Sequence, residues 1–464
     1  MSNDFKGGDM NSKQTETASL GEAITPTEQV VMGKVWKRIL FLGFLLLLFA
    51  QVDKHNIAYA GLTMSRDLGL TATMFGVCVS IFYVGYILCE IPSNLIMARV
   101  GPRFWLARIS ITLGLASATT MFAVGFKSLL VIRFVLGMAE SGMIPGLLLY
   151  FTYWFPPSYR ARANAWFLVA MPIAGMLASI LSGTILDLNG KYGLAGWQWL
   201  FLLLGVPPII LGILALILLT DRPRDAVWLS AAERLVLATL LTDKPSHSQA
   251  QQPTQATAGW VAALLSRDVI FLAIANLGVF VALSILTTWT PQIVRALVPG
   301  DKFTLLGWLA ALPALAAAIT MPLWSKRSDK RRERKWHIII PSALAVVGLL
   351  LTMSVEVPGI KLAGLIMCSI GAYGGYGVFW SLVAQVIPER HRPAGIAMIH
   401  AFGSAGAILS PVMIGFLRDL TGNFGAGLLF AAGMLSVSIL LLMQVRDGLK
   451  EYAPLAGAVV PSRP

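Results

Sequence analysis

Residues 198–219 read QWLFLLLGVPPIILGILALILL, and the polar segment 221–266 follows them almost at once. A helix needs about 20 apolar residues to cross the hydrocarbon core of a bilayer, and the first stretch supplies them. The second runs from Asp221 through a Gln, Ser and Thr-rich part near His247 to Ser266, a composition typical of a linker. This junction predicts a membrane-spanning helix that closes one half of the protein.

Apolar runs of the same kind occur on both sides of the linker. Those before it lie at 38–62, 74–97, 104–124, 128–152, 164–187 and 198–219, and those after it at 268–290, 303–324, 337–355, 360–385, 394–416 and 425–445. We therefore expect an all-α membrane protein with twelve transmembrane helices in two six-helix halves, which suggests an internal repeat. The predicted parts are an N-terminal tail (1–35), a first half (36–220), the linker (221–266), a second half (267–446) and a C-terminal tail (447–464).

The composition excludes several other classes of protein. Hydrophobic residues make up 56% of the chain and charged residues 13%, against about a quarter charged in soluble domains. The net charge of +13 forms no continuous basic face, so no nucleic-acid partner is expected. Cys78, Cys89 and Cys368 lie in apolar runs without paired spacing, so neither a metal nor a cofactor is expected. The sequence shows no nucleophile with a base and no phosphate-binding Gly loop, which argues against an enzyme.

The distribution of Lys and Arg predicts the orientation, because cytoplasmic loops are the richer in positive charge. Four short loops placed in the cytoplasm carry Arg99, Arg103, Arg160, Arg162, Lys326, Arg327, Lys330, Arg331, Arg332, Arg334, Lys335, Arg390 and Arg392. The six opposite loops carry only Arg66, Lys127, Lys191, Arg295, Lys302, Lys361 and Arg418. We expect a multi-pass protein of the inner (plasma) membrane that acts as a monomer, with both termini in the cytoplasm. The first apolar run is too long, and too lacking in a small-residue cleavage site, for a removable signal peptide.

Four ionisable residues lie within predicted spans, where charge is costly and marks functional sites. Asp53 and Lys54 are adjacent in the first span, and Arg133 and Glu140 lie in the fourth. The second pair is separated by two helical turns, about 10.5 Å, on one face. Gly137 between them lets a neighbouring helix or a ligand approach. On each helix the opposite charges are expected to neutralise each other.

The four charges suit the binding of an anion together with protons. In this interpretation Lys54 and Arg133 attract a substrate carboxylate, and Asp53 and Glu140 take up protons. A buried carboxylate stays ionised beside a cation and favours its neutral form once a substrate anion claims that cation. The alternative is that these residues form interhelical salt bridges that only hold the bundle together.

Further polar and aromatic residues could complete the site. His55 in the first span and His400 in the eleventh could relay protons, although a lone histidine is more often a hydrogen-bonded packing residue. Substrate-binding candidates that could line a cavity are Asn56, Tyr83, Tyr86, Trp380, Ser381, Gln385 and His400. The aromatic members could instead be interfacial anchors or core residues. Glu90, near the cytoplasmic end of the second span, is expected to act in gating or in ordering the loop rather than in substrate contact.

These residues belong to motifs that resemble the anion:cation symporters of the major facilitator superfamily over about residues 36–446. In the first half the resemblance rests on DKHNI (53–57), DLGL (67–70), EIPSN (90–94), RFVLGMAE (133–140), YWFP (153–156) and GWQWLF (196–201). In the second half it rests on WTPQ (289–292), GFLRD (415–419) and SDK (328–330), which lies in a basic loop similar to the superfamily's gating signature and adds Asp329 as a gating candidate.

The resemblance implies import of organic acids with protons, with Asp53, Lys54, Arg133 and Glu140 in the family's coupling and anion-binding positions. TMFG (73–76), ARANA (161–165) and SILSG (179–183) resemble the 4-hydroxyphenylacetate permease branch, which favours an aromatic acid. The alternatives are a dicarboxylate or sugar acid such as tartrate or phthalate, and a proton-coupled efflux carrier. The family usually has Arg at position 54, and Lys is a point charge without the two-pronged carboxylate contact.

Overall fold

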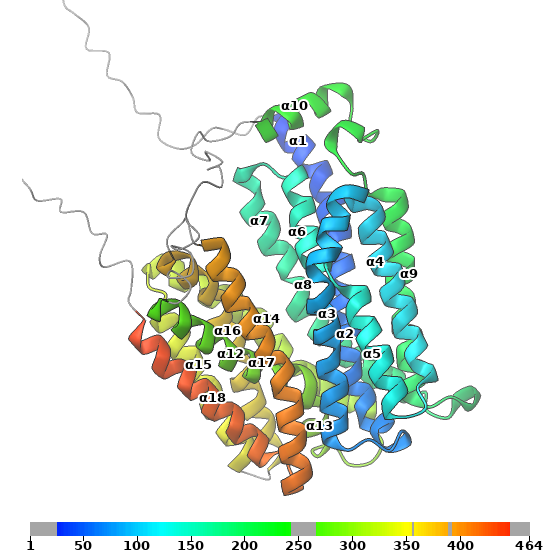
Figure 1. Ribbon diagram of the computed structural model, residues 1–464, viewed down its shortest axis with the longest axis vertical. Helices are drawn as coiled ribbons and strands as arrows, with labels where there is room; N and C mark the ends of the chain where they lie inside the picture. Colours follow the sequence, from blue (N-terminus) through cyan, green and yellow to red (C-terminus); the bar gives the residue numbers. More distant parts are fainter. Residues whose placement is uncertain (1–25, 243–265, 355–356, 388–391, 446–464) are drawn as a thin grey trace, which may run out of the picture.

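The computed structural model describes residues 26–242, 266–354, 357–387 and 392–445, and these residues fold into helices joined by short turns (Figure 1). In hydrocarbon, every backbone N–H and C=O needs a partner within the chain, which a helix provides. Within the described residues, eleven helices are long and apolar enough to cross a membrane. With the helix that covers the third predicted span, they confirm the all-α fold of two six-helix halves.

The first half contains the helices that hold the four charged residues. Its elements are α1 (Pro26–Val35), η1 (Trp36–Leu40), α2 (Phe41–Asp67), α3 (Ala72–Val100), α4 (Pro102–Thr119), η2 (Thr120–Phe122), α5 (Phe126–Glu140), α6 (Met143–Trp154), α7 (Pro157–Leu168), α8 (Ala170–Leu186), η3 (Lys191–Gly193) and α9 (Gly196–Leu218). The fourth predicted span is thus broken into α5 and α6, at Ser141 and Gly142.

The second half repeats the same order of long helices. Its elements are α12 (Arg267–Ser284), η5 (Ile285–Trp289), α13 (Thr290–Arg295), α14 (Phe303–Arg331), α15 (Trp336–Ser354), α16 (Pro358–Val386), α17 (Arg392–Thr421) and α18 (Gly425–Gln444). Figure 1 shows the two halves side by side, the first in blue to green and the second in green to red.

The third predicted span is α4, which is not among the eleven apolar helices. Arg103 and Arg108 lie on it and lower its mean hydropathy. It is nevertheless part of the bundle, because Ser110 Oγ donates to the carbonyl of Pro208 in α9 at 2.7 Å. Packing in the bundle therefore identifies this span more clearly than hydropathy does.

The first part of the predicted linker is folded against the first half. It forms η4 (Pro223–Asp225) and α10 (Ala231–Thr242), which lies beside α1 at the top of Figure 1. Trp228 stacks on Trp154 with ring centroids 5.4 Å apart, and Lys34 Nζ pairs with Glu233 Oε1 at 2.7 Å. The linker thus begins with a docked segment, which its polar composition did not indicate.

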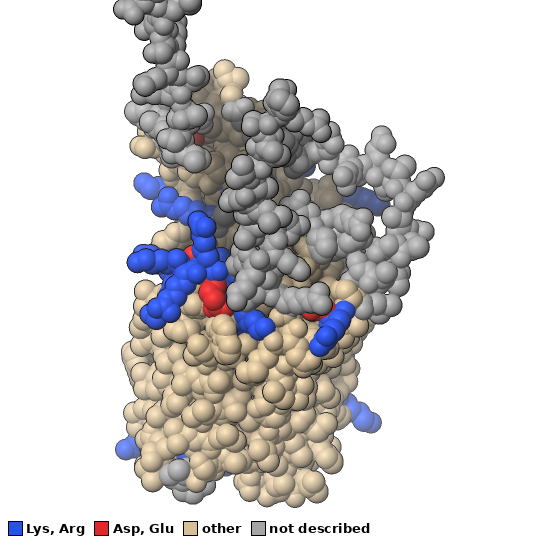
Figure 2. Space-filling model, turned by 90° about the vertical axis from the view of Figure 1, so that its left-hand side faces the viewer, with Lys and Arg blue, Asp and Glu red and all other residues tan. Residues whose placement is uncertain are grey.

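Charge is distributed unevenly over the surface. On the face shown in Figure 2, many of the visible Lys and Arg side chains gather toward the upper end, and the body below them is largely uncharged. The cations at the end of α14 and in the turn before α15 are mostly exposed: Lys326, Arg327, Lys330, Arg331 and Arg332. Such a pattern fits an apolar belt with charged loops on one side.

Candidate functional site

Three consecutive residues of α2 point in three directions, because successive side chains on a helix are about 100° apart. Asp53 faces α4, where its Oδ1 accepts a hydrogen bond from Ser117 Oγ. Lys54 faces α5, and His55 faces the second half, where its ring hydrogen-bonds with the backbone of Thr287. One turn of α2 therefore brings a carboxylate, an amine and an imidazole to three different neighbours.

Lys54 and Glu140 form an ion pair between α2 and α5. Lys54 Nζ lies 2.9 Å from Glu140 Oε1, and the two side chains are 18% and 3% exposed. The ammonium also lies over the rings of Phe82 and Tyr86, 5.3 and 5.1 Å from their centroids. The amine is thus held by one carboxylate and by two aromatic faces of α3.

Arg133 is buried against Phe82, the α3 ring that Lys54 also contacts. Its Nε donates to the carbonyl of Cys78 at 3.3 Å, and its guanidinium lies 4.8 Å from the ring centroid of Phe82. Its Nη1 is buried without a hydrogen-bond partner among the described residues. A buried donor with no partner is costly and calls for an explanation, for which a bound anion is a strong candidate.

Asp53 is hydrogen-bonded by neutral polar side chains, and Arg133 interacts with it electrostatically without a direct ion pair. Asn56 Nδ2 donates to its Oδ1 at 3.2 Å, beside the bond from Ser117. Its Oδ2 has no partner among the described residues, and neither has Glu140 Oε2. Each of the two carboxylates thus keeps one free oxygen, a natural place for a proton.

Close contact between α3 and α5 places these charges. A Cβ on Gly137 would lie 2.0 Å from the carbonyl oxygen of Phe82, and one on Gly85 would lie 2.4 Å from that of Phe134. Only glycine at both positions lets the backbones approach this closely. Helix α5 ends directly after Glu140, and Gly142 follows with φ 87°. The predicted role of Gly137 in close approach agrees with this geometry.

The expected pairing of charges on each helix is wrong. Asp53 does not pair with Lys54, nor Arg133 with Glu140; the ion pair joins Lys54 to Glu140 across helices. Adjacent residues point about 100° apart, which separates Asp53 from Lys54. The 10.5 Å rise between Arg133 and Glu140 separates the other pair. The charges are still balanced, because two acids and two bases share this region.

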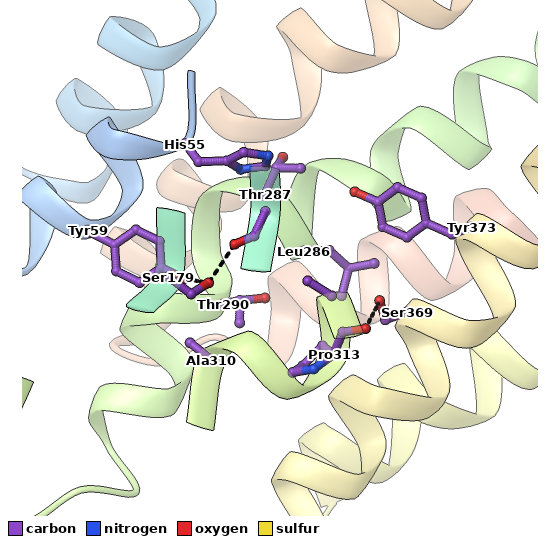
Figure 3. A pocket seen from close by; sticks show the side chains of 12 residues that line it. His55, Tyr59, Ser179, Leu286, Thr287, Thr290, Ala310, Pro313, Ser369 and Tyr373 are labelled. Atoms are coloured by element: carbon purple, nitrogen blue, oxygen red, sulfur yellow. Dashed lines mark hydrogen bonds between the residues drawn. The ribbon is translucent and has the colours of Figure 1, made fainter. Parts of the chain in front are cut away.

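A small cavity lies where His55 meets the second half. His55 and Tyr59 of α2 face Ser369 and Tyr373 of α16 across it (Figure 3). Its volume of about 30 Å³ has room for water and not for an organic acid. Tyr373 also lies close enough to Tyr83 to interact with it electrostatically. The cavity therefore lies between α2, which carries Asp53 and Lys54, and α16 of the second half.

The predicted residues of the second half form an aromatic cluster. The Trp380 and His400 rings stack with centroids 6.2 Å apart, and Tyr376 meets Trp380 at the same distance. Ser381, which follows Trp380 in the chain, is half-buried, whereas Gln385 is exposed near the end of α16. The structure thus brings Trp380 and His400 together, and it places Gln385 apart from them.

Neither gating candidate forms an ion pair with the four charges among the described residues. Glu90 is half-buried on α3, where its carbonyl accepts from Asn94 Nδ2 at 2.8 Å. Asp329 is exposed at the end of α14 and pairs with Arg334 at 2.5 Å. Their predicted role in gating stays a prediction.

Some residues of this region were missed by sequence reasoning. Ser117 binds Asp53, and Tyr373 connects His55 with Tyr83. Tyr373 precedes Trp380 by seven residues, two helical turns on the same face, and this spacing could have indicated it. Ser117 is a single small polar residue in an apolar run, which gives no comparable signal.

A bundle of two helical halves with buried charges on the central helices defines a membrane transport protein, not an enzyme. The Major Facilitator Superfamily model matches residues 39–300 and 300–461, and the chain belongs to this family. It is 38% identical to a putative tartrate transporter of Agrobacterium vitis, over 91% of this chain and 93% of the relative. It is 31% identical to a quinolone resistance transporter of Acinetobacter baumannii, over 86% and 90%.

A solved structure with the same fold is that of a D-xylose–proton symporter. Its TM-score to this chain is 0.73 at 14% identity, and the match covers 89% of this chain and 98% of that one. At this identity the similarity concerns the fold alone.

Proposed function

We propose that this transporter imports a small organic carboxylate together with protons across the inner membrane, with both termini in the cytoplasm. The observation that carries the proposal is the buried Nη1 of Arg133, which has no partner among the described residues and belongs to a guanidinium that packs on Phe82, as the Lys54 ammonium does. A carboxylate bound there would satisfy that donor and neutralise a guanidinium in a region of low dielectric.

Substrate and proton are coupled through Lys54 in this proposal. A substrate carboxylate that approaches Arg133 competes with Glu140 for the Lys54 ammonium. Glu140 then loses its cation while it stays buried, and a proton on its free Oε2 removes the resulting unpaired charge. Binding of the anion and uptake of the proton therefore favour each other, which is the requirement for symport.

Asp53 supplies a second position for a proton. Its free Oδ2 is buried, and the bonds from Ser117 and Asn56 to Oδ1 fix the orientation of the carboxyl group. Rocking of the halves would expose the site to each side in turn, so that protons bind outside and leave inside.

The two cations of the site, Lys54 and Arg133, bear on which acid is transported. A dicarboxylate such as tartrate could bind Arg133 and Lys54 at once, and the putative tartrate transporter among the relatives favours testing it first. The Trp380–His400 stack is the observation that favours an aromatic acid such as 4-hydroxyphenylacetate, because an aromatic ring could pack on it.

An efflux carrier is the rival function. The quinolone resistance transporter among the relatives supports it, and the same carboxylates could drive exchange with protons. Two buried cations, Lys54 and Arg133, favour an anion over a cationic drug, since unlike charges attract. Direction of transport is therefore tested together with the substrate.

The experiment is uptake of radiolabelled tartrate into proteoliposomes, with and without an inward proton gradient and with 4-hydroxyphenylacetate and phthalate as competitors. Gradient-dependent accumulation that is lost in Arg133→Ala supports the proposal. Uptake that does not depend on the proton gradient would contradict proton coupling. Competition by 4-hydroxyphenylacetate alone would assign an aromatic acid, and gradient-driven extrusion of a quinolone would favour efflux.

A further inference from the structure

A sequence pattern occurs twice in the chain, once near the end of the fifth span and once near the end of the eleventh. Residues 183–190 read GTILDLNG and residues 415–422 read GFLRDLTG, so each contains a Gly, an Asp four positions later and a second Gly three further on. The helices that face them begin with a second shared pattern, TMFG at 73–76 and TLLG at 304–307. In a fold of two repeated halves, the fifth span corresponds to the eleventh and the second to the eighth.

The two Asp residues make the same contacts, atom for atom, across the boundary between the halves. Asp187 Oδ1 accepts from Phe303 N at 3.2 Å, and its Oδ2 accepts from Thr304 N at 3.1 Å and from the Thr304 hydroxyl. Asp419 Oδ1 accepts from Ala72 N at 2.9 Å, and its Oδ2 accepts from Thr73 N at 2.8 Å and from the Thr73 hydroxyl at 2.5 Å. Each carboxylate of one half thus caps the first turn of a helix in the other half.

The paired glycines bring the helices into contact below each carboxylate. A Cβ on Gly183 would lie 2.4 Å from the carbonyl oxygen of Phe303, and one on Gly415 would lie 2.3 Å from that of Ala72. On the facing helices, a Cβ on Gly307 would lie 2.5 Å from Ser179 O, and one on Gly76 would lie 2.2 Å from Pro411 O. Ser179 and Pro411 each stand eight residues before the Asp of their own helix.

These contacts lie at the end of the bundle opposite α1 and α10, at the bottom of Figure 1, where α3 and α14 begin. A carboxylate at a helix N-terminus meets unsatisfied N–H groups and the positive end of the helix dipole. Because each set of contacts joins the two halves, it exists only while this end of the bundle is closed. Opening this end breaks both sets of contacts together.

We infer that Asp187 with Thr304, and Asp419 with Thr73, form a pair of equivalent clamps that hold the outer gate closed during the transport cycle. The inference rests on the proposed orientation and on alternating access, and it assigns positioning roles to four residues outside the charge cluster. The clamps contain no titrating partner on the facing helix, because the donors are backbone N–H and hydroxyl groups. They therefore set the balance between closed and open states without taking part in substrate binding.

The test measures how fast a reporter thiol reacts from outside. In a background of Cys78→Ala, Cys89→Ala and Cys368→Ala, the reporter is Ala310→Cys, which is 3% exposed here and lies on α14 between Thr304 and the centre of the bundle. A membrane-impermeant maleimide is applied to right-side-out and to inside-out vesicles, so that orientation is determined separately. No substrate is present, so failure of the substrate assignment does not affect the result.

Asp187→Asn and Asp419→Asn are each expected to speed outside labelling about threefold, and the double variant about tenfold, since hydrogen bonds to a charged group are lost. Asp67→Asn is the matched control, because Asp67 accepts from Trp197 Nε1 within the first half. Gly183→Ala and Gly415→Ala should act in the same direction through backbone collision, whereas Gly433→Ala meets no atom within 4 Å and should not.

Unchanged outside labelling in the Asp double variant would overturn the inference, provided that the protein elutes as a single folded peak. If the Asp variants do not fold, the glycine variants decide in the same way. Faster labelling in Asp67→Asn or Gly433→Ala as well would also overturn it, because the effect would then reflect general loosening.

Discussion

Lys54 Nζ lies 2.9 Å from Glu140 Oε1, while the neighbouring Asp53 turns away to Ser117 on another helix. Two adjacent residues of opposite charge are thus assigned to different partners. In the proposed mechanism this separates a carboxylate in direct contact with a cation, Glu140, from one held by hydrogen bonds, Asp53.

Glu140→Gln should abolish proton-driven accumulation and retain exchange of labelled for unlabelled substrate. The glutamine amide can still hydrogen-bond with Lys54, but it cannot take up a proton. Uptake under a gradient and counterflow in proteoliposomes measure the two activities. Glu233→Gln, which removes a carboxylate at the surface, serves as the control. Full accumulation by Glu140→Gln would contradict the coupling role.

Lys54→Gln should destabilise the protein more than the double variant Lys54→Gln with Glu140→Gln. The single change leaves Glu140 as a buried unpaired charge, for which the cost is about 3 kcal/mol. The second change removes that charge. Thermal unfolding of the detergent-solubilised protein checks the order, and a double variant that is less stable than both single variants would refute the buried ion pair.

Arg133→Lys should raise the KM for the carboxylate about tenfold, because lysine lacks the forked donors of the guanidinium. Lys54→Arg should keep transport, because an arginine at this position can still pair with Glu140. Initial rates over a range of substrate concentrations compare the two. Equal KM values for wild type and Arg133→Lys would remove Arg133 from the anion site.

Trp380→Ala should weaken 4-hydroxyphenylacetate about fivefold as a competitor and leave tartrate nearly unchanged, if the Trp380–His400 stack contacts the substrate. Competition against labelled tartrate measures both acids in one assay. Trp336→Ala, which removes an exposed tryptophan near the start of α15, is the control. Equal losses for the two acids would indicate a packing role for Trp380.

Docking of α10 should depend on pH through Glu233. The hydrogen bond from Lys34 holds the pKa of Glu233 below its ordinary value. A carboxylate with a lowered folded-state pKa stabilises the docked state above its unfolded pKa, and this stabilisation is lost as pH falls through the folded pKa. Fluorescence of Trp228, stacked on Trp154, reports undocking. Lys34→Ala should move the midpoint toward higher pH, and an unmoved midpoint would exclude this contact as the cause.

The fold could be predicted from sequence because each span carries its own signal. Apolar runs such as 198–219 specify helices whatever their neighbours do. Charged residues inside these runs, such as Arg133, can be recognised as site candidates because burying a charge in the membrane is energetically unfavourable. The third span was the least apolar, and its place in the bundle came from contacts such as Ser110 with Pro208.

The pairing of charges could not be predicted, because it depends on the rotation and separation of helices. The sequence places Asp53 beside Lys54, yet the partner of Lys54 is 86 positions further on. Close approach at Gly137 and Gly85 fixes which faces of α3 and α5 meet, and that registration is a property of packing. The docking of Trp228 on Trp154 is likewise invisible in a segment whose composition is polar.

The four charged residues of the site, Asp53, Lys54, Arg133 and Glu140, belong to the first half, and the Trp380–His400 stack belongs to the second. In the proposed mechanism, the first half therefore supplies the coupling charges and the second half supplies an aromatic surface for the substrate. A substitution on α16 or α17 would alter the substrate-binding surface and leave the four charged residues of the first half unchanged. Relatives of such a chain can therefore change their substrate specificity while they keep the same proton-coupling residues.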